Sequence, residues 1–166
     1  MGYIIPVLLG YLLGSSNMAY YISRYQKKDI RSGGTGNLGA SNATVLLGWK
    51  AGITVALHDI GKAALSVLLA NALFPDVEHA GVAAGVAAVY GHIFPFYLKF
   101  KGGKGFASYM GMTLALNWKL ALCLIAAIIV ITIITDYIVC GTVTAIVTVP
   151  VYMGITTHSF LLVAIL

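Results

Sequence analysis

The amino-acid sequence predicts an all-α, polytopic transmembrane protein with about six or seven membrane segments and cytoplasmic Gly-rich loops. Of its 166 residues, 60% are hydrophobic and only 9% are Asp, Glu, Lys or Arg, and the mean hydropathy is +0.93. A soluble domain carries about 25% charged residues, so this chain has too little polar surface to cover a soluble globule. Its apolar runs are continuous rather than alternating, which favours membrane helices over a β-barrel. The length suits one domain.

Three membrane spans are expected before residue 99. The first, Tyr3–Ile22, has about the 20 residues needed to cross a bilayer core, and it is interrupted by a polar patch at residues 14–17. The second, Ala51–Leu73, and the third, Ala80–Leu98, are joined by a turn without Lys or Arg. The third span is rich in Gly and Ala, so we expect it to pack closely against a neighbouring helix.

Four further apolar segments follow. Phe106–Leu116 is too short to cross upright, so we expect it to be tilted or re-entrant. Leu120–Thr135 and a run from Tyr137 to about Tyr152 are expected to span the membrane. A last segment, Ser159–Leu166, stops after eight residues, so we expect the chain to be truncated at this end.

The positive charges are concentrated in two short stretches. The chain has ten Lys or Arg and five Asp or Glu, which gives a net charge of +5. Five of the cations lie within residues 24–50 and three within residues 99–104. The positive-inside rule therefore places both stretches on the cytoplasmic side and the N-terminus outside. Such clusters also attract anionic substrates or lipid headgroups. Nucleic acid is not expected as a partner, because most of the chain is not available to water.

A Gly-rich segment, residues 32–42, follows the first cations. Its glycines match G-x-G-x-x-G, but a dinucleotide fold requires a strand before this motif, and here a membrane span precedes it. Successive glycine N–H groups can converge on an anion, and Ser41 or Asn42 can cap a following helix. The alternative is a flexible membrane loop. The candidate substrate-binding residues here are Arg31, Gly34, Thr35, Gly36, Asn37, Gly39, Ser41 and Asn42.

A second Gly-rich loop carries Lys104. A lysine framed by glycines suits a phosphate, because the backbone approaches closely and the side chain adds a point charge. It is not a Walker A loop, since Leu98 stands at the first glycine position and Gly105 follows the lysine. The alternative is a purely topological anchor. His92 is either a ligand for a polar headgroup or a structural histidine. We take Lys104 and His92 as candidate catalytic residues and the following as substrate-binding: Lys101, Gly102, Gly103 and Gly105.

The second span contains a charged pair, Asp59 and Lys62, three residues apart on one helical face, with His58 one turn from Lys62. A charge at mid-membrane costs about 2.5–3.5 kcal/mol on insertion scales, so it normally faces a partner or a wet cavity. The pair either holds helices together or contributes to a substrate cavity. In the first span, Ser15 and Asn17 either pack between helices or line that cavity; we favour the cavity, and Ser15 is a candidate substrate-binding residue. No metal-ligand set or cofactor motif is apparent, so we expect neither.

These motifs, in this order, resemble the PlsY-type acyl-phosphate:glycerol-3-phosphate acyltransferases. The resemblance covers most of residues 8–112 and weakens after about residue 120. The segments that carry it are Gly14-Ser15, Asp29-Ile30-Arg31, Gly34 to Asn42, Asp59-x-x-Lys62, His92-x-Phe94-Pro95 and Phe100 to Ala107.

The resemblance implies a single transmembrane acyltransferase domain, residues 1–166, in a bacterial inner membrane, with the active site facing the cytoplasm. It would transfer a fatty acyl group from acyl phosphate to the 1-hydroxyl of glycerol 3-phosphate, giving lysophosphatidic acid and phosphate for phospholipid synthesis. No acyl-enzyme is implied, because acyl phosphate is already activated, and the site must bind two phosphates and stabilise developing charge. The implied partners are both substrates and membrane lipids, and the implied state is a monomer.

The chain departs from the family pattern at Thr35, Leu38 and Ser41, where Ser, Pro and Thr are usual, and more seriously at three further places. Val45 stands where an Arg is usual, residues 136–139 replace an Arg-Tyr-x-Ser motif, and the C-terminal family motif has no counterpart. Two alternatives to the acyltransferase therefore remain open. One is a catalytically degenerate relative that binds lipid or anions, and the other is a small transporter that uses the Asp59–Lys62 pair.

Overall fold

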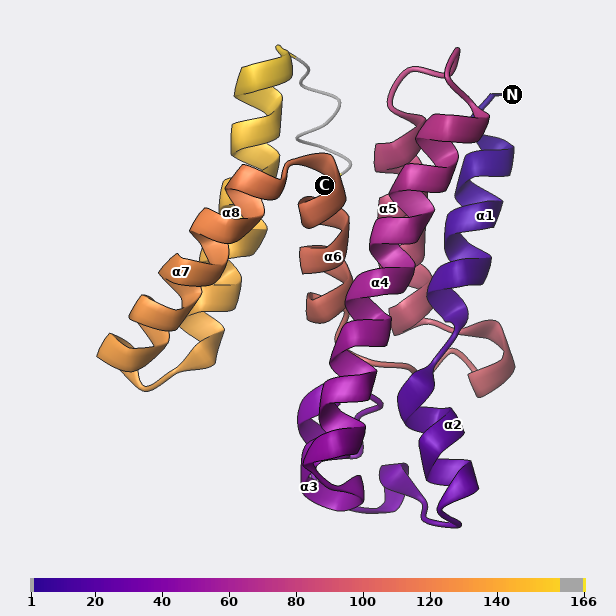
Figure 1. Cartoon of the computed structure of the whole chain (residues 1–166), viewed down its shortest axis with the longest axis vertical. Helices are drawn as coiled ribbons and strands as arrows, with labels where there is room; N and C mark the ends of the chain where they lie inside the picture. The colour runs from indigo at the N-terminus through magenta and orange to yellow at the C-terminus, as the bar shows by residue number, and fades with distance from the viewer. Residues whose placement is uncertain (1, 159–165) are drawn as a thin grey trace. The chain divides into compact units, whose positions relative to one another are not determined.

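A computed structural model describes residues 2–158 and 166, and all regular structure in that part of the chain is helical (Figure 1). This confirms the all-α prediction. The elements are α1 (Ile4–Ser15), α2 (Met18–Tyr25), η1 (Ile30–Ser32), α3 (Ala40–Leu47), α4 (Trp49–Leu73), α5 (Ala80–Ile93), η2 (Phe96–Leu98), α6 (Phe106–Leu116), α7 (Trp118–Thr135) and α8 (Ile138–Thr157).

Several of these helices are long and apolar enough to cross a membrane, which confirms a multi-pass membrane protein. The shorter apolar helix α6 agrees with the segment predicted at the same residues. The predicted last segment, 159–166, lies outside the described residues except for Leu166. The number of membrane segments, about six or seven, stays a prediction. Within the part of the chain that the structure describes, four stretches are candidate spans: Trp49–Leu73, Ala80–Leu98, Trp118–Thr135 and Ile138–Thr157.

The first predicted span is not one continuous helix. It breaks between α1 and α2 because Asn17 is extended, with φ −131° and ψ 102°, and its side-chain oxygen accepts a hydrogen bond from the Tyr20 N–H at 2.9 Å. An Asn at this position caps a new helix by satisfying one of its free amides. The polar patch noted in the sequence is therefore a helix junction.

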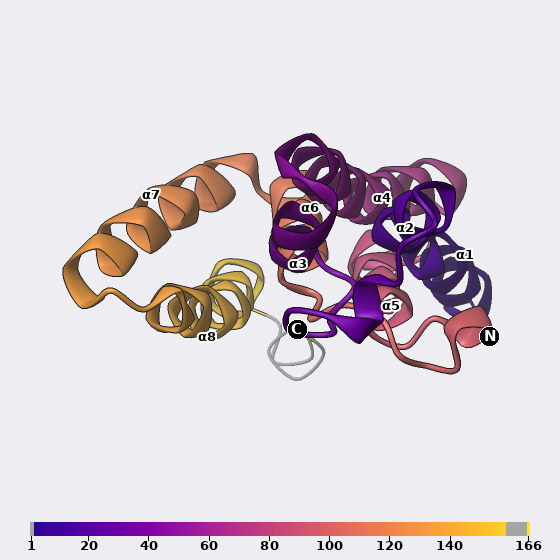
Figure 2. The same ribbon diagram turned by 90° about the horizontal axis from the view of Figure 1, so that it is seen from below.

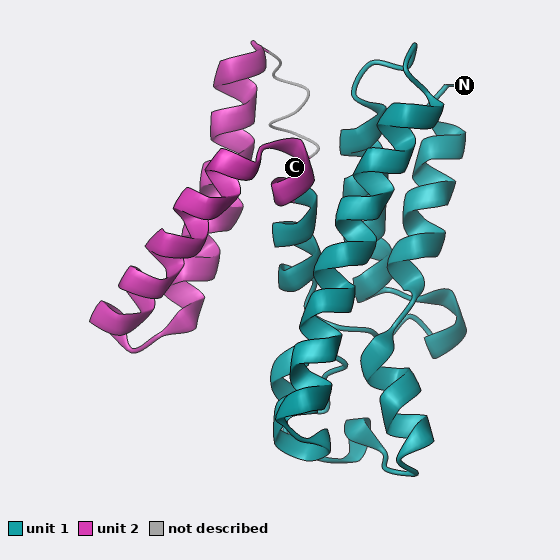
Figure 3. Cartoon of the chain, in the orientation of Figure 1, with its two compact units in different colours: residues 1–112 teal, residues 113–166 magenta. Residues whose placement is uncertain are grey.

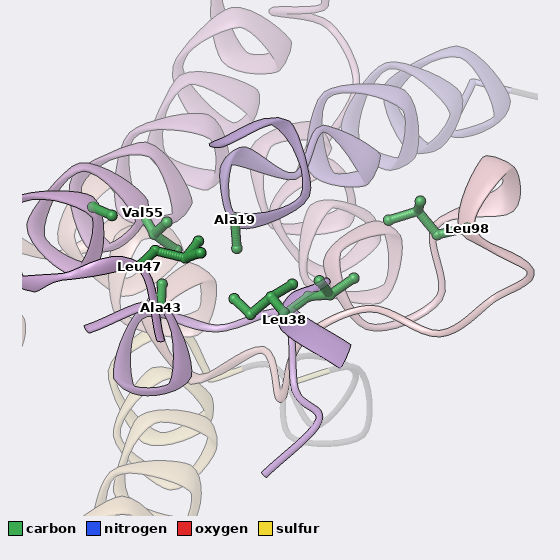
Figure 4. Close-up of a cluster of buried hydrophobic side chains, with 8 residues drawn as sticks. Ala19, Leu38, Ala43, Leu47, Val55 and Leu98 are labelled. Atoms are coloured by element: carbon green, nitrogen blue, oxygen red, sulfur yellow. The ribbon is translucent and has the colours of Figure 1, made fainter. Parts of the chain in front are cut away.

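The chain forms two compact units, residues 1–112 and 113–166 (Figure 3). In the first unit, α1 packs along α5 so closely that a Cβ on Gly14 would overlap the Ala88 carbonyl oxygen. This confirms close packing of the Gly- and Ala-rich third span. A hydrophobic core beside it joins α2, α3, α4 and both loops (Figure 4). Its buried residues are Ala19, Ile30, Leu38, Ala43, Leu47, Ala51, Val55 and Leu98.

The second unit is built mainly from α7 and α8, which lie side by side (Figures 1 and 2). In the apolar 18-residue stretch of each helix, only 11% of α7 and 17% of α8 is buried inside the protein. Large apolar side chains such as Ile133 and Ile134 are about three-quarters exposed, at 73% and 75%. Surfaces of this kind suit contact with lipid. The expectation of a single functional domain over residues 1–166 stays a prediction.

Candidate active site

A cluster of buried and half-buried polar residues joins α4, α5 and the junction between α1 and α2. We call it the polar centre, and its members are Ser16, His58, Asp59, Lys62 and His92. The Lys62 ammonium nitrogen lies 2.9 Å from Asp59 Oδ1 and 2.8 Å from His92 Nδ1, and it donates to the Ser16 carbonyl oxygen at 2.7 Å. Asp59, Lys62 and His92 are only 1%, 6% and 2% exposed. The predicted ion pair is confirmed, and it connects helices.

The break between α1 and α2 explains why Lys62 finds a partner 46 residues away. Helix ends leave carbonyl oxygens without an intrahelical donor, and a buried carbonyl needs one. The Lys62 ammonium supplies it to Ser16. The Ser16 hydroxyl in turn lies 3.1 Å from His58 Nε2, and His58 Nδ1 lies 3.6 Å from Asp59 Oδ1. The polar centre therefore ties the helix junction to α4 and α5.

The second glycine loop is attached to the polar centre through His92. The Gly103 N–H donates to the His92 carbonyl at 3.1 Å, and the Gly102 N–H donates to the Ile93 carbonyl at 2.9 Å. A Cβ on Gly103 would overlap His92 Nε2, so only glycine fits here. His92 Nδ1 also lies 3.3 Å from Asp59 Oδ1, so this ring nitrogen contacts both members of the ion pair. These contacts fix the backbone directly before Lys104, which is exposed.

The first glycine loop is held by the side chain of Asn42, which is 3% exposed. Its amide nitrogen donates to the carbonyl oxygens of Ile30 at 2.9 Å and Asn37 at 3.0 Å, and its oxygen accepts from the Thr35 N–H at 3.0 Å. Gly34 adopts a left-handed φ of 58°, which favours glycine. The loop is therefore preorganised from within.

The predicted site residues differ in exposure: some are exposed, some are half-buried and some are buried. Ser15 and Asn17, predicted to line a cavity, are both 1% exposed, and the Ser15 hydroxyl donates to the Tyr11 carbonyl at 2.7 Å. The prediction that Ser41 or Asn42 caps the next helix was wrong, because α3 begins at Ala40 with Gly39 as its N-cap. The exposed predicted residues are Arg31, Gly34, Thr35, Gly36, Ser41, Lys101 and Lys104; Asn37, Gly39 and Gly102 are half-buried; and Ser15, Asn42, His92, Gly103 and Gly105 are buried.

Residues of the first glycine loop and the residue before the second loop share one buried hydrophobic cluster of the first unit. Leu98, just before the second loop, belongs to the same buried cluster as Ile30 and Leu38 of the first (Figure 4). The Asn17 amide also approaches the Leu38 carbonyl at 3.4 Å. Sequence reasoning grouped His58 with Asp59 and Lys62 but missed Ser16 as a member of the site. The only signal for Ser16 was the polar patch in an apolar run.

These features define an integral membrane protein with two glycine loops of fixed geometry. A family model described as glycerol-3-phosphate acyltransferase matches residues 4–166. Among curated relatives, glycerol-3-phosphate acyltransferase 1 of Oceanobacillus iheyensis is 39% identical over 148 residues, which cover 85% of this chain and 72% of that protein. The Coxiella burnetii enzyme is 38% identical over 154 residues, 92% and 79% of the two chains. The Myxococcus xanthus enzyme is 48% identical over 117 residues, 70% and 61%.

Two solved structures of PlsY, an integral membrane glycerol 3-phosphate acyltransferase, share the fold. The glycerol 3-phosphate form superposes with a TM-score of 0.86 at 29% identity, covering 99% of this chain and 84% of that one. The lysophosphatidic acid form gives 0.85 at 28% identity with the same coverage. The chain belongs to the glycerol-3-phosphate acyltransferase family, as the resemblance of its motifs predicted.

Proposed function

We propose that this chain transfers a fatty acyl group from acyl phosphate to the 1-hydroxyl of glycerol 3-phosphate, giving lysophosphatidic acid and phosphate. The observation that carries the proposal is the fixed Gly102-Gly103 turn, which presents the exposed Lys104 beside a buried ionic cluster. The solved PlsY structures, in a glycerol 3-phosphate form and a lysophosphatidic acid form, support this acceptor and product.

The chemistry needs positioning and charge stabilisation more than a protein nucleophile. The acceptor hydroxyl oxygen forms an ester bond with the acyl carbon, the bond from that carbon to the phosphate oxygen breaks, and the hydroxyl proton leaves with the phosphate. Negative charge develops on the carbonyl oxygen and on the departing phosphate. Lys104 supplies a cation for it, and the glycine loops supply a fixed backbone that can approach a phosphate closely without rearrangement. The apolar helices accommodate the acyl chain.

We assign the remaining predicted residues by their placement. His92 is buried and touches the loop, so we propose that it positions Lys104 without contacting substrate itself. The exposed residues of both loops, including Arg31, Thr35 and Lys101, are proposed to contact the two phosphates. Both basic stretches are proposed to face the cytoplasm of a bacterial cell, with the chain multi-pass in the inner membrane and monomeric.

The test is turnover by the purified protein with acyl phosphate and glycerol 3-phosphate, followed as phosphate release. Lys104→Ala is expected to lower the rate at least tenfold, because one charged contact to the transition state is worth about 2–4 kcal/mol. Lys50→Ala removes an exposed cation outside both loops and is expected to change the rate less than twofold. Acyl phosphate that binds but is never turned over by the intact protein would instead identify a degenerate, anion-binding relative.

A further inference from the structure

A hollow of about 490 Å³ lies where α2 turns into η1, and half of its lining residues are basic. We propose that this basic hollow binds the phosphate-bearing headgroup of an anionic membrane lipid and that its occupancy stabilises the first glycine loop. The importance of the first glycine loop for activity rests on the proposed function, whereas binding of the lipid headgroup in the hollow does not. The hollow is lined by Tyr20, Ser23, Arg24, Lys27, Lys28, Asp29, Ile30 and Arg31.

The hollow is a built feature of the turn. Ser23, 3% exposed, organises it: its hydroxyl donates to the Lys28 carbonyl and accepts from the Ile30 N–H at 3.2 Å. The Lys28 N–H donates to the Ser23 carbonyl at 3.0 Å, closing the same turn. Lys27 is held in the left-handed region, at φ 54°, which a residue with a side chain rarely adopts. The fold thus keeps four cations around one space.

The charge around this space is poorly balanced. Asp29 is its only acid, and that carboxylate accepts the Arg31 N–H at 3.0 Å and lies 3.8 Å from the Arg31 side chain. Within the described residues, no ion pair is found for Arg24 or Lys27. Like charges held close together repel, and an anion between them relieves that repulsion. A phosphate ester has the charge and the acceptor oxygens to do so.

The surroundings favour a lipid as the source of this phosphate. Tyr25, in the last turn of α2, is 89% exposed, and Tyr20 lines the hollow with the Arg31 guanidinium 6.0 Å from its ring centre. Exposed tyrosine next to a basic cluster is typical of the membrane–water interface, where anionic headgroups are abundant. A volume of this size also matches small-molecule sites. A free phosphate compound shares the chemistry, so the test must separate the two.

Occupancy of the basic hollow reaches the first glycine loop through Ile30. This residue lines the hollow and is 1% exposed, and its carbonyl accepts the Asn42 amide at 2.9 Å. The same Asn42 side chain holds the Thr35 N–H. A headgroup that fixes η1 therefore fixes one anchor of the loop.

The experiment uses the full chain in neutral detergent, without acyl phosphate. Short-chain phosphatidylglycerol, short-chain phosphatidylcholine and inorganic phosphate are titrated, and binding is followed as the shift in thermal unfolding and as retained lipid in native mass spectrometry. Phosphatidylglycerol is expected to raise the Tm of the wild type by several degrees and phosphatidylcholine to leave it unchanged. Arg24→Gln/Lys27→Gln is expected to weaken phosphatidylglycerol binding at least fivefold.

The control is Lys50→Gln/Lys119→Gln, which removes the same charge from exposed sites outside the hollow and is expected to bind normally. Equal losses in both double variants would overturn the proposal, because general attraction to the basic protein would explain them. Inorganic phosphate as effective as the lipid would overturn the lipid assignment. Lys104→Ala is expected to retain phosphatidylglycerol binding. A wild-type protein that binds phosphatidylglycerol but does not turn over acyl phosphate and glycerol 3-phosphate would refute the proposed function and leave the proposal for the basic hollow standing.

Discussion

The two glycine loops of this membrane protein are held in different ways. The first is organised from within by one neutral side chain, Asn42, whose bonds to Ile30, Asn37 and Thr35 span at most 12 residues. The second is attached to His92, and through it to the buried charges of α4 and the α1–α2 junction. Its geometry therefore depends on how distant helices pack, whereas that of the first loop is largely local. A perturbation of the polar centre should spread, and one at Asn42 should stay confined.

The largest effect is expected when Lys62 loses its charge. Lys62→Met leaves the Asp59 carboxylate buried and uncompensated, which destabilises a protein by about 3–5 kcal/mol. Asp59→Asn/Lys62→Met removes both charges and is expected to recover most of that loss. Thermal unfolding in detergent measures both variants, with the exposed Lys50→Met on the same helix as the matched control. If the single and double variants unfold alike, the ion pair is not what holds this region together.

A smaller and more specific effect is expected at the contact between His92 and the second loop. Gly103→Ala places a methyl group on the imidazole, so the turn before Lys104 must shift. A displacement of about 1 Å at a catalytic group costs about 100-fold in rate, so we expect kcat/KM to fall by that order. Gly61→Ala is the control, because nothing lies within 4 Å of its added Cβ. Equal rates in the two variants would show that the contact does not position Lys104.

The local features of this site were predictable from the sequence. The helical spans follow from apolar run length, and the Asp59–Lys62 pair follows from its spacing of three on one helix. The contact of Lys62 with Ser16 was not predictable, because it depends on a helix break and on packing between α1 and α4. Nor could the sequence show that His92 faces Gly103 across a turn. Periodicity reports which face of a helix is apolar and carries no information on which neighbour covers it.

The same limit applies to Asn42, whose role came out differently from the prediction. The residue type and its place in a Gly-rich segment indicated a substrate ligand or a helix cap, since Asn suits both. In the structure its amide is buried and satisfied by loop backbone, and Gly39 caps α3. Only the folded loop shows that the carbonyl of Ile30, 12 residues away, comes within reach of its side chain.

The smallest effect is expected when the first loop loses this internal support. Asn42→Ala leaves the Thr35 N–H without its acceptor and the Ile30 carbonyl without its donor. Each lost hydrogen bond lowers the free energy of unfolding by at most about 1–3 kcal/mol. We expect faster hydrogen exchange at residues 33–37 with unchanged exchange at Gly102 and Gly103. Ser41→Ala, at an exposed neighbouring position, is expected to change unfolding by less than about 0.5 kcal/mol. Faster exchange in both loops of Asn42→Ala would mean that they are coupled, and the contrast between a local and a long-range support would fail.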